Sequence, residues 1–308
     1  MQSQIQLSIG LPNFGSLLPP EDWRRFIDLG RMADDAGIDR LMLVDHVVMG
    51  TNTDAYIWGQ FPTAPEDPWL EPLTLFSGIA AATSRVRLAT GILIAPLRGA
   101  ALLAKTAATL DVISGGRLEL GVATGWQREE YEAAGLDWNN RGQLLDDTLA
   151  ACRALWQHTP ASFASDTLEF TDIYCSPKPL QPGGVPFWIG GPLHRRNLDR
   201  ITRWGDGWIP IMGTPPSGVA EGVNQIRTAW ASAGRQGDRL DVRGSLPLVG
   251  DGETFDLART MEGVPELAAA GATAVHLPFQ PFCQDITAAP RFFREARRRF
   301  DVVMGRAR

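Results

Sequence analysis

Short strand-like runs alternate with helix-like runs almost without interruption along this chain of 308 residues. A strand, a helix and a second strand in succession form the repeating unit of a parallel sheet. The eight expected strands are residues 5–10, 40–44, 86–92, 117–122, 187–190, 207–211, 241–246 and 273–277. Eight such units predict an α/β fold of the (β/α)8 or TIM-barrel type.

The expected helices lie between these strands, at 21–36, 70–82, 99–112, 193–204, 219–233, 265–270 and 290–303. The alternation lapses in residues 126–186, where an apolar stripe predicts a helix over 143–157 and further apolar residues predict a hairpin within 163–174. We interpret about 126–186 as an insertion after the fourth strand, carried by a single domain that spans residues 1–308.

An open, doubly wound sheet is the alternative architecture. Such a sheet usually has fewer strands and carries Gly-x-Gly-x-x-Gly after the first of them. Here the first strand leads into Gly10-Leu11-Pro12-Asn13-Phe14-Gly15, which lacks that spacing and contains a proline. The barrel therefore remains the expected fold.

The composition excludes several kinds of partner. The net charge is −6 and no basic stripe is present, so nucleic acid is not an expected partner. No apolar run approaches the roughly 18 residues of a membrane span, and residues 1–10 lack the features of a signal sequence. The isolated cysteines Cys152, Cys175 and Cys283 indicate free thiols and a cytoplasmic protein. The four histidines are scattered, so no metal site is expected.

Asp45-His46 follows the second expected strand. The active sites of barrels lie at the carboxyl ends of the strands. A histidine at such a place can donate or accept a proton near neutral pH, and a neighbouring carboxylate can raise its basicity or fix its tautomer. The alternative is a histidine that only satisfies backbone groups of its loop.

The third and fourth strands also end in unusual residues. Gly91 lies within Thr90-Gly91-Ile92, and a glycine inside a strand usually marks a bulge or a close approach of backbone. On these residues alone, a bulge that closes the barrel is favoured over a platform beneath a planar ring. After the fourth strand, Thr124 can hydrogen-bond a ligand, and Trp126 can flank a pocket or cap the core.

The fifth strand ends in Gly190-Gly191-Pro192 and leads into a helical pattern at Leu193. Glycine lets a ligand approach the backbone, and free amides at the start of a helix attract phosphate. Arg195 and Arg196 could add cationic contacts in the first turn. The alternative is a tight turn with solvated arginines, and we favour the phosphate site.

Aromatic residues gather in the long loop 45–68 and beside it. Loops of this length usually have a function or move. We expect an apolar or ring-bearing substrate, in a pocket that includes Asn13, Trp69 and Trp126.

Several motifs together resemble the luciferase-like monooxygenase superfamily over nearly the whole chain. They are residues 84–98 (SRVRLATGILIAPLR), 103–111 (LAKTAATLD), 114–118 (SGGRL), 177–179 (PKP), 188–191 (WIGG) and 205–208 (GDGW). Residues 45–48 (DHVV), with 68–72 (PWLEP), look most like the branch of the superfamily that uses the deazaflavin coenzyme F420.

The resemblance implies a barrel that binds a flavin-type ring at its carboxyl face. In deazaflavin-dependent relatives, the histidine that matches His46 lies by the reacting ring and donates or accepts a proton. The bond that matches Gly91–Ile92 is a non-proline cis peptide that supports the ring, and the residues that match Gly190 to Pro192 hold the cofactor phosphate through backbone amides. The cofactor-binding residues expected here are Asp45, Thr90, Gly91, Ile92, Thr124, Gly190, Gly191, Pro192 and Leu193.

One departure from the family pattern bears on the substrate. Some deazaflavin dehydrogenases carry a glutamate as an acid in the loop after the fourth strand. Here that stretch reads TGWQ at 124–127, with Glu129 and Glu130 further on, so a sugar-phosphate dehydrogenase is not expected.

We therefore expect an oxidoreductase that transfers a hydride between coenzyme F420 and a small or medium organic substrate, with His46 handling the proton. One alternative is a monooxygenase that uses reduced FMN to activate oxygen. A second alternative is a cofactor-free binding protein on the same fold. Members of the superfamily are often dimers, so a homodimer is a further expectation.

Overall fold

Eight parallel strands close into a barrel in the computed structural model, which describes residues 5–306. Pairing of β1 with β11, and of β3 with β5, completes the ring, so the expected fold class is confirmed. The barrel strands are β1 (Gln6–Gly10), β2 (Arg40–Leu43), β3 (Arg87–Thr90), β5 (Leu118–Ala123), β8 (Phe187–Gly190), β9 (Gly207–Ile209), β10 (Asp241–Ser245) and β11 (Ala274–Pro278).

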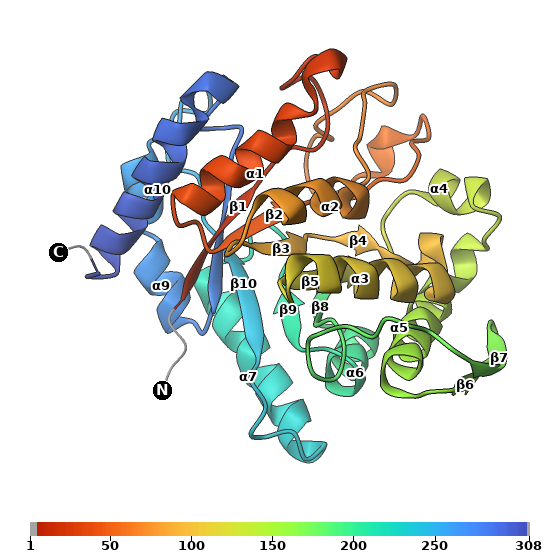
Figure 1. Cartoon of the computed structure of the whole chain (residues 1–308). Helices are drawn as coiled ribbons and strands as arrows, with labels where there is room; N and C mark the ends of the chain where they lie inside the picture. The colour runs from red at the N-terminus through yellow and green to blue at the C-terminus, as the bar shows by residue number, and fades with distance from the viewer. Residues whose placement is uncertain (1–4, 307–308) are drawn as a thin grey trace.

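Helices surround these strands (Figure 1). The first helices pack on one another in chain order, α1 on α2, α2 on α3 and α3 on α5. Apolar side chains fill the space between strands and helices, and every residue of β2 is buried. The helices are α1 (Arg25–Asp35), α2 (Pro72–Ala82), α3 (Ala100–Ser114), α4 (Arg128–Ala133), α5 (Arg141–Gln157), α6 (Arg195–Arg203), α7 (Pro216–Ser232), α8 (Leu257–Met261), α9 (Val264–Ala269) and α10 (Ala289–Val303).

Some elements differ from the sequence-based expectations. The expected strand 86–92 is interrupted after Thr90, and pairing resumes as β4 (Leu93–Ile94) beside β5. The expected helix 21–36 begins at Arg25, because residues Pro20–Asp22 form a separate 3-10 turn. Helices α4 and α8 span only 6 and 5 residues, too few for a helical apolar period to show in the sequence.

Residues 126–186 add a helix and a hairpin to the barrel. The apolar stripe of α5 packs against α3 and so joins the outer helix layer. The expected hairpin is present as β6 (Ala161–Ala164) and β7 (Glu169–Ile173), paired antiparallel. It lies at the periphery of the molecule, beyond α5 (Figure 1).

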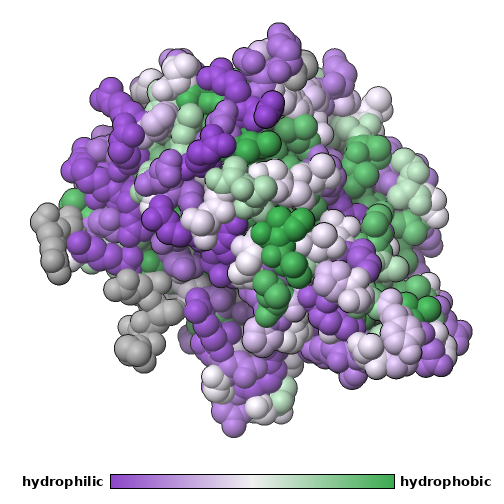
Figure 2. Space-filling model, in the orientation of Figure 1, coloured by the Kyte–Doolittle hydropathy of each residue, from purple (hydrophilic) through white to green (hydrophobic). Residues whose placement is uncertain are grey.

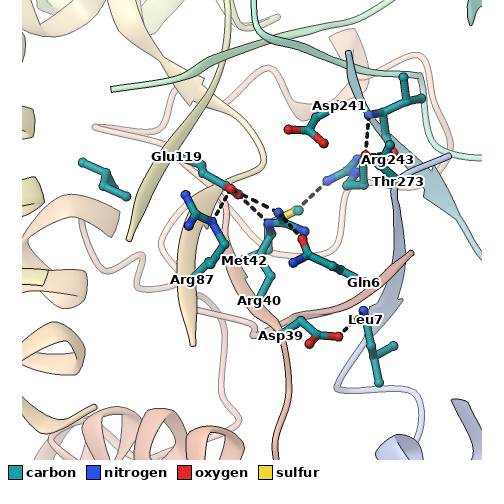
Figure 3. A network of polar contacts seen from close by, with 12 residues as sticks. Gln6, Leu7, Asp39, Arg40, Met42, Arg87, Glu119, Asp241, Arg243 and Thr273 are labelled. Carbon is teal, nitrogen blue, oxygen red and sulfur yellow. Dashed lines mark hydrogen bonds and ion pairs between the residues drawn. The ribbon is translucent and has the colours of Figure 1, made fainter. Parts of the chain in front are cut away.

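An ionic network closes the amino-terminal end of the barrel (Figure 3). Arg40 of β2 and Arg87 of β3 both donate to the carboxylate of Glu119 on β5, and Arg40 also donates to Gln6 of β1. Arg40 and Glu119 are buried. Because charged groups fill this end, a ligand can enter only from the carboxyl ends of the strands.

The surface is mostly hydrophilic in the view of Figure 2, with an apolar patch on the face that carries α3. Leu102, Val112 and Ile113 are the exposed apolar residues of this helix. The homodimer stays a prediction. Within residues 5–306, every helix is too short or too polar to cross a bilayer.

Candidate active site

A cavity of about 580 Å³ opens at the carboxyl ends of the strands. Most of the expected site residues line it, although they come from four strand ends and from loops that are distant in sequence. These residues are Asp45, His46, Trp69, Gly91, Ile92, Thr124, Trp126, Gly190, Gly191 and Pro192.

Three expected site residues turn their side chains elsewhere. The Asn13 amide donates to the backbone oxygens of Val44 and Leu70, at 2.9 and 2.7 Å, and so fixes the loop instead of lining the pocket. Thr90 donates to the Gly121 carbonyl at 2.8 Å, which joins β3 to β5. The Leu193 side chain packs into the core against α7.

His46 lies beside Glu130, a residue of α4. His46 Nδ1 is 3.0 Å from Glu130 Oε2, and the other carboxylate oxygen accepts the Val47 amide at 3.0 Å. Both side chains are buried. A carboxylate only accepts hydrogen bonds, so Nδ1 carries a proton and Nε2 is the nitrogen left to face a ligand. Glu130, and not the adjacent Asp45, thus supplies the carboxylate that was expected beside His46.

Replacing Glu130 with glutamine should lower kcat about tenfold, because an amide can donate as well as accept and so no longer fixes which ring nitrogen of His46 carries the proton. KM should change little, since Glu130 acts through His46. Steady-state kinetics of Glu130→Gln, Glu130→Asp and the adjacent control Glu129→Gln would check this. Equal kcat for Glu130→Gln and the control would contradict a role for Glu130 in positioning His46.

Aromatic rings enclose His46. Its ring meets those of Trp69, Phe61 and Trp126 edge-on, with centroids 4.7, 5.5 and 5.5 Å away. Tyr56 adds a further ring against Phe61 and Trp126, and burial raises the pKa of its hydroxyl, which stays protonated. These rings exclude water from the histidine and form an apolar wall suited to a flat ligand.

Asp45 pairs with Arg98 instead of His46. The Arg98 nitrogens Nη1 and Nη2 lie 2.7 and 2.8 Å from its two oxygens, and the Ile94 amide donates to it at 2.8 Å. Arg98 also bonds to Glu71, the N-cap residue of α2. Asp45 therefore fixes the end of β2 against β4 and so positions the interruption of the third strand.

The peptide bond between Gly91 and Ile92 is cis, as the resemblance predicts. A Cβ atom at Gly91 would collide with the Met42 side chain and lie 2.8 Å from Arg243 Nη1. A Cβ atom at Gly190, on the facing strand, would lie 2.6 Å from Ile92 Cγ2. Glycines at these two positions therefore let neighbouring side chains pack closely on the backbone that lines the cavity.

The backbone of the 190–193 turn is partly used by the protein itself. The Gly191 amide donates to Ile209 at 2.9 Å, and the Gly191 carbonyl accepts the indole NH of Trp208 at 2.9 Å. Pro192 has no amide proton. The Leu193 and His194 amides make no hydrogen bond within residues 5–306, so both are free to donate to an anion.

The cationic contact expected from Arg195 and Arg196 is not formed at the cavity. Arg196 pairs with Asp146 of α5, and Arg195 is exposed. Arg200 lines the cavity instead, held by Asp146 and by Asn197. Arg196 and Arg200 are four residues apart, which is about one helical turn. The sequence-based prediction therefore chose arginines one turn too close to the start of α6.

Sequence reasoning missed Arg243 of β10 and His276 of β11, which line the deep end of the cavity. Strand β10 carries polar residues at alternate positions, Asp241, Arg243 and Ser245, whereas His276 is the one polar residue of the otherwise apolar β11. Polar residues on the inward-facing positions of these strands would have been the available signal.

A comparison of the sequence with known families finds the luciferase-like monooxygenase family over residues 4–270. The chain belongs to this family. Its members are oxidoreductases and monooxygenases.

Individual relatives of this luciferase-like chain differ in cofactor. An uncharacterised protein of Mycobacterium bovis is 33% identical over 214 residues, which cover 68% of this chain and 73% of that protein. The FMNH2-dependent dimethylsulfone monooxygenase of Pseudomonas putida is 31% identical over 167 residues, or 53% of this chain and 45% of that enzyme. The coenzyme F420-dependent tetrahydromethanopterin reductase of Methanopyrus kandleri superposes with a TM-score of 0.69 and 16% identity, over 96% of this chain and 99% of that one.

Proposed function

We propose that this chain is an oxidoreductase that transfers a hydride between coenzyme F420 and a small or medium organic substrate. The proposal rests on the surroundings of His46. This histidine is buried against Glu130 and surrounded by aromatic rings, and it lines the same cavity as the cis peptide bond between Gly91 and Ile92. A reductase of this fold uses coenzyme F420, and the sequence around His46 resembles that branch.

The residues of the cavity fit a flat, polar-edged ring. Gly91 and Gly190 line the cavity and let the side chains of Met42, Arg243 and Ile92 pack directly on their backbone. Within residues 5–306, Arg243 Nε and His276 Nδ1 are buried with no hydrogen-bond partner. Both residues also line the cavity, where their polar side chains would meet the polar edge of a ligand.

Each group of this site then has a definite task. Coenzyme F420, when bound, would supply the hydride carrier. His46 would hold or accept a proton at Nε2, while Glu130 keeps the proton on Nδ1. The aromatic rings would exclude water and seat an apolar substrate, and the Leu193 and His194 amides would bind the cofactor phosphate. Trp126, at the start of the 126–186 segment, would help to shape the substrate pocket.

Titration with oxidised F420 and oxidised FMN tests the choice of cofactor. We expect saturable F420 binding and weaker FMN binding, followed by fluorescence. Tight FMN binding without F420 binding would instead favour the FMNH2-dependent monooxygenase, which the Pseudomonas putida relative makes the second candidate. Failure of both cofactors to bind would favour a cofactor-free binding protein.

A pair of glycine variants makes the titration specific to the 190–193 turn. Gly191 has a φ of +110° and Gly234, in the loop after α7, a φ of +76°. Alanine at either position strains the backbone, by about 1–3 kcal/mol. Gly191→Ala should shift the turn and weaken F420 binding about tenfold, whereas Gly234→Ala should leave the Kd unchanged. Equal Kd values in both variants would argue against a phosphate site at this turn.

A further inference from the structure

Two side chains meet the deep end of the cavity from neighbouring strands. Arg243 and His276 belong to β10 and β11, whose register pairs Arg243 with Ala274 and Ser245 with His276. The barrel interior around Arg243, including Met42 and the Arg40 network, is drawn in Figure 3. Neither side chain has a task in the proton transfer described above.

Arg243 has no carboxylate partner within residues 5–306. Its one side-chain hydrogen bond there is from Nη1 to the sulfur of Met42, and its Nε has no acceptor. Asp241, two residues earlier on β10, pairs with Arg239, and the Glu119 carboxylate is shared by Arg40 and Arg87. A buried cation of this kind is unfavourable in a protein whose cavity holds only water, because an ion removed from solvent needs a compensating charge.

His276 adds a neutral polar group next to this cation. Burial, and then the charge of Arg243, holds the pKa of His276 well below its ordinary value, so the imidazole stays neutral. Burial, and then the charge of Arg40, lowers the pKa of Arg243 to about 10, which leaves the guanidinium charged at neutral pH. Arg243 therefore brings a positive charge, and His276 a neutral ring, to the lining of the cavity.

Two glycines hold these side chains in place. A Cβ atom at Gly10 would lie 2.9 Å from His276 Nε2, and a Cβ atom at Gly91 would lie 2.8 Å from Arg243 Nη1. His276 thus packs against Gly10 of the neighbouring strand β1, whereas Arg243 reaches across the barrel to Gly91, the residue that follows β3. Arg243 is a cation without a carboxylate partner, and it lies beside Gly91 at the cavity. A ligand would compensate this charge if the edge that faces Arg243 were anionic or rich in hydrogen-bond acceptors.

We propose that Arg243 and His276 bind the pyrimidinedione edge of the cofactor ring and bind the reduced cofactor more tightly than the oxidised one. The inference rests on the proposed function. Reduction adds electron density that can appear as negative charge along the ring nitrogen and carbonyl of this edge, and a nearby cation stabilises that charge. Arg243 and His276 thereby set the redox preference of the site, a task separate from the proton transfer at His46.

Dissociation constants of oxidised and reduced F420 test the inference, measured anaerobically for the wild type, Arg243→Met and Arg243→Lys. The wild type should bind the reduced form more tightly. Arg243→Met should lose at least about tenfold of this preference, equivalent to about a 30 mV fall in the two-electron potential of the bound cofactor. Arg243→Lys keeps a charge and should retain part of it. The control Arg87→Met removes a cation that does not line the cavity and should keep the full preference.

The outcomes separate this inference from the proposed function. If the wild type binds F420 and Arg243→Met keeps the same ratio of dissociation constants, the inference is wrong and the proposed function stands. If the ratio is unchanged but Arg243→Met raises KM for acidic substrates only, the cation binds the substrate and the inference is wrong. If the wild type binds no F420, the proposed function and the inference both fail.

The stability of the ligand-free protein gives an independent readout. Loss of an unpaired buried cation should raise the unfolding midpoint of ligand-free Arg243→Met by about 2–4 °C. Arg40→Met, which breaks a paired cation of the same interior, should lower it. A lower midpoint for Arg243→Met would show that Arg243 supports the fold and would overturn its assignment as a ligand-binding group.

Discussion

His46→Gln should reduce kcat by about 10²–10⁴-fold, while the Kd for cofactor stays within about threefold of the wild type. Glutamine keeps the approximate size of imidazole and can bond to Glu130, but it cannot exchange a proton near neutral pH. The aromatic rings around His46 exclude water, so a water molecule should not take over the proton transfer in the variant. Turnover of a substrate that the wild type accepts, together with a cofactor titration, gives both quantities.

His158→Gln is the matched control for this prediction. His158 is exposed at the end of α5, away from the cavity, so the same substitution there should leave kcat unchanged. If His46→Gln and His158→Gln have equal kcat, His46 does not handle the proton, and the proposed mechanism would need another group. A loss confined to Kd would show instead that His46 only shapes the cavity.

The barrel itself could be predicted because its signals are local. Alternating strands and helices show in short windows of sequence, and strand ends such as Asp45-His46 and Gly190-Gly191 lie where the fold places active sites. The resemblance added the cis bond at Gly91–Ile92, which no propensity of these residues indicates.

The partners of those residues could not be predicted, because they are set by tertiary contacts. Glu130 lies 84 positions from His46 and Arg98 lies 53 from Asp45, so neither pairing leaves a local pattern. The sequence also did not show in which direction a side chain at a strand end points. Thr90 and Gly91 are adjacent, yet Thr90 bonds to Gly121 and only Gly91 lines the cavity.

Glu119→Leu should destabilise the fold by about 3–5 kcal/mol, the largest effect on stability expected for a single substitution in this chain. It removes the one carboxylate that Arg40 and Arg87 share at the closed end of the barrel, and leaves the Arg40 charge buried. Chemical denaturation should show the loss as a lower midpoint with an unchanged slope. The half-buried control Glu295→Gln, on α10, should cost less than about 1 kcal/mol.

A double variant and a pH series test the physical reason for this loss. Arg40→Met with Glu119→Leu should recover most of the stability, because apolar residues can replace a buried ion pair when both partners are removed.

Burial alone would raise the pKa of Glu119, but the charges of Arg40 and Arg87 outweigh burial and hold it below 4.5. A lowered pKa stabilises the fold above the unfolded-state value and loses that effect as the pH falls through the folded-state value. The stability gap between wild type and Glu119→Leu should therefore narrow below about pH 4.5; a gap that stays constant would mean that lost packing, not lost charge, destabilises the variant.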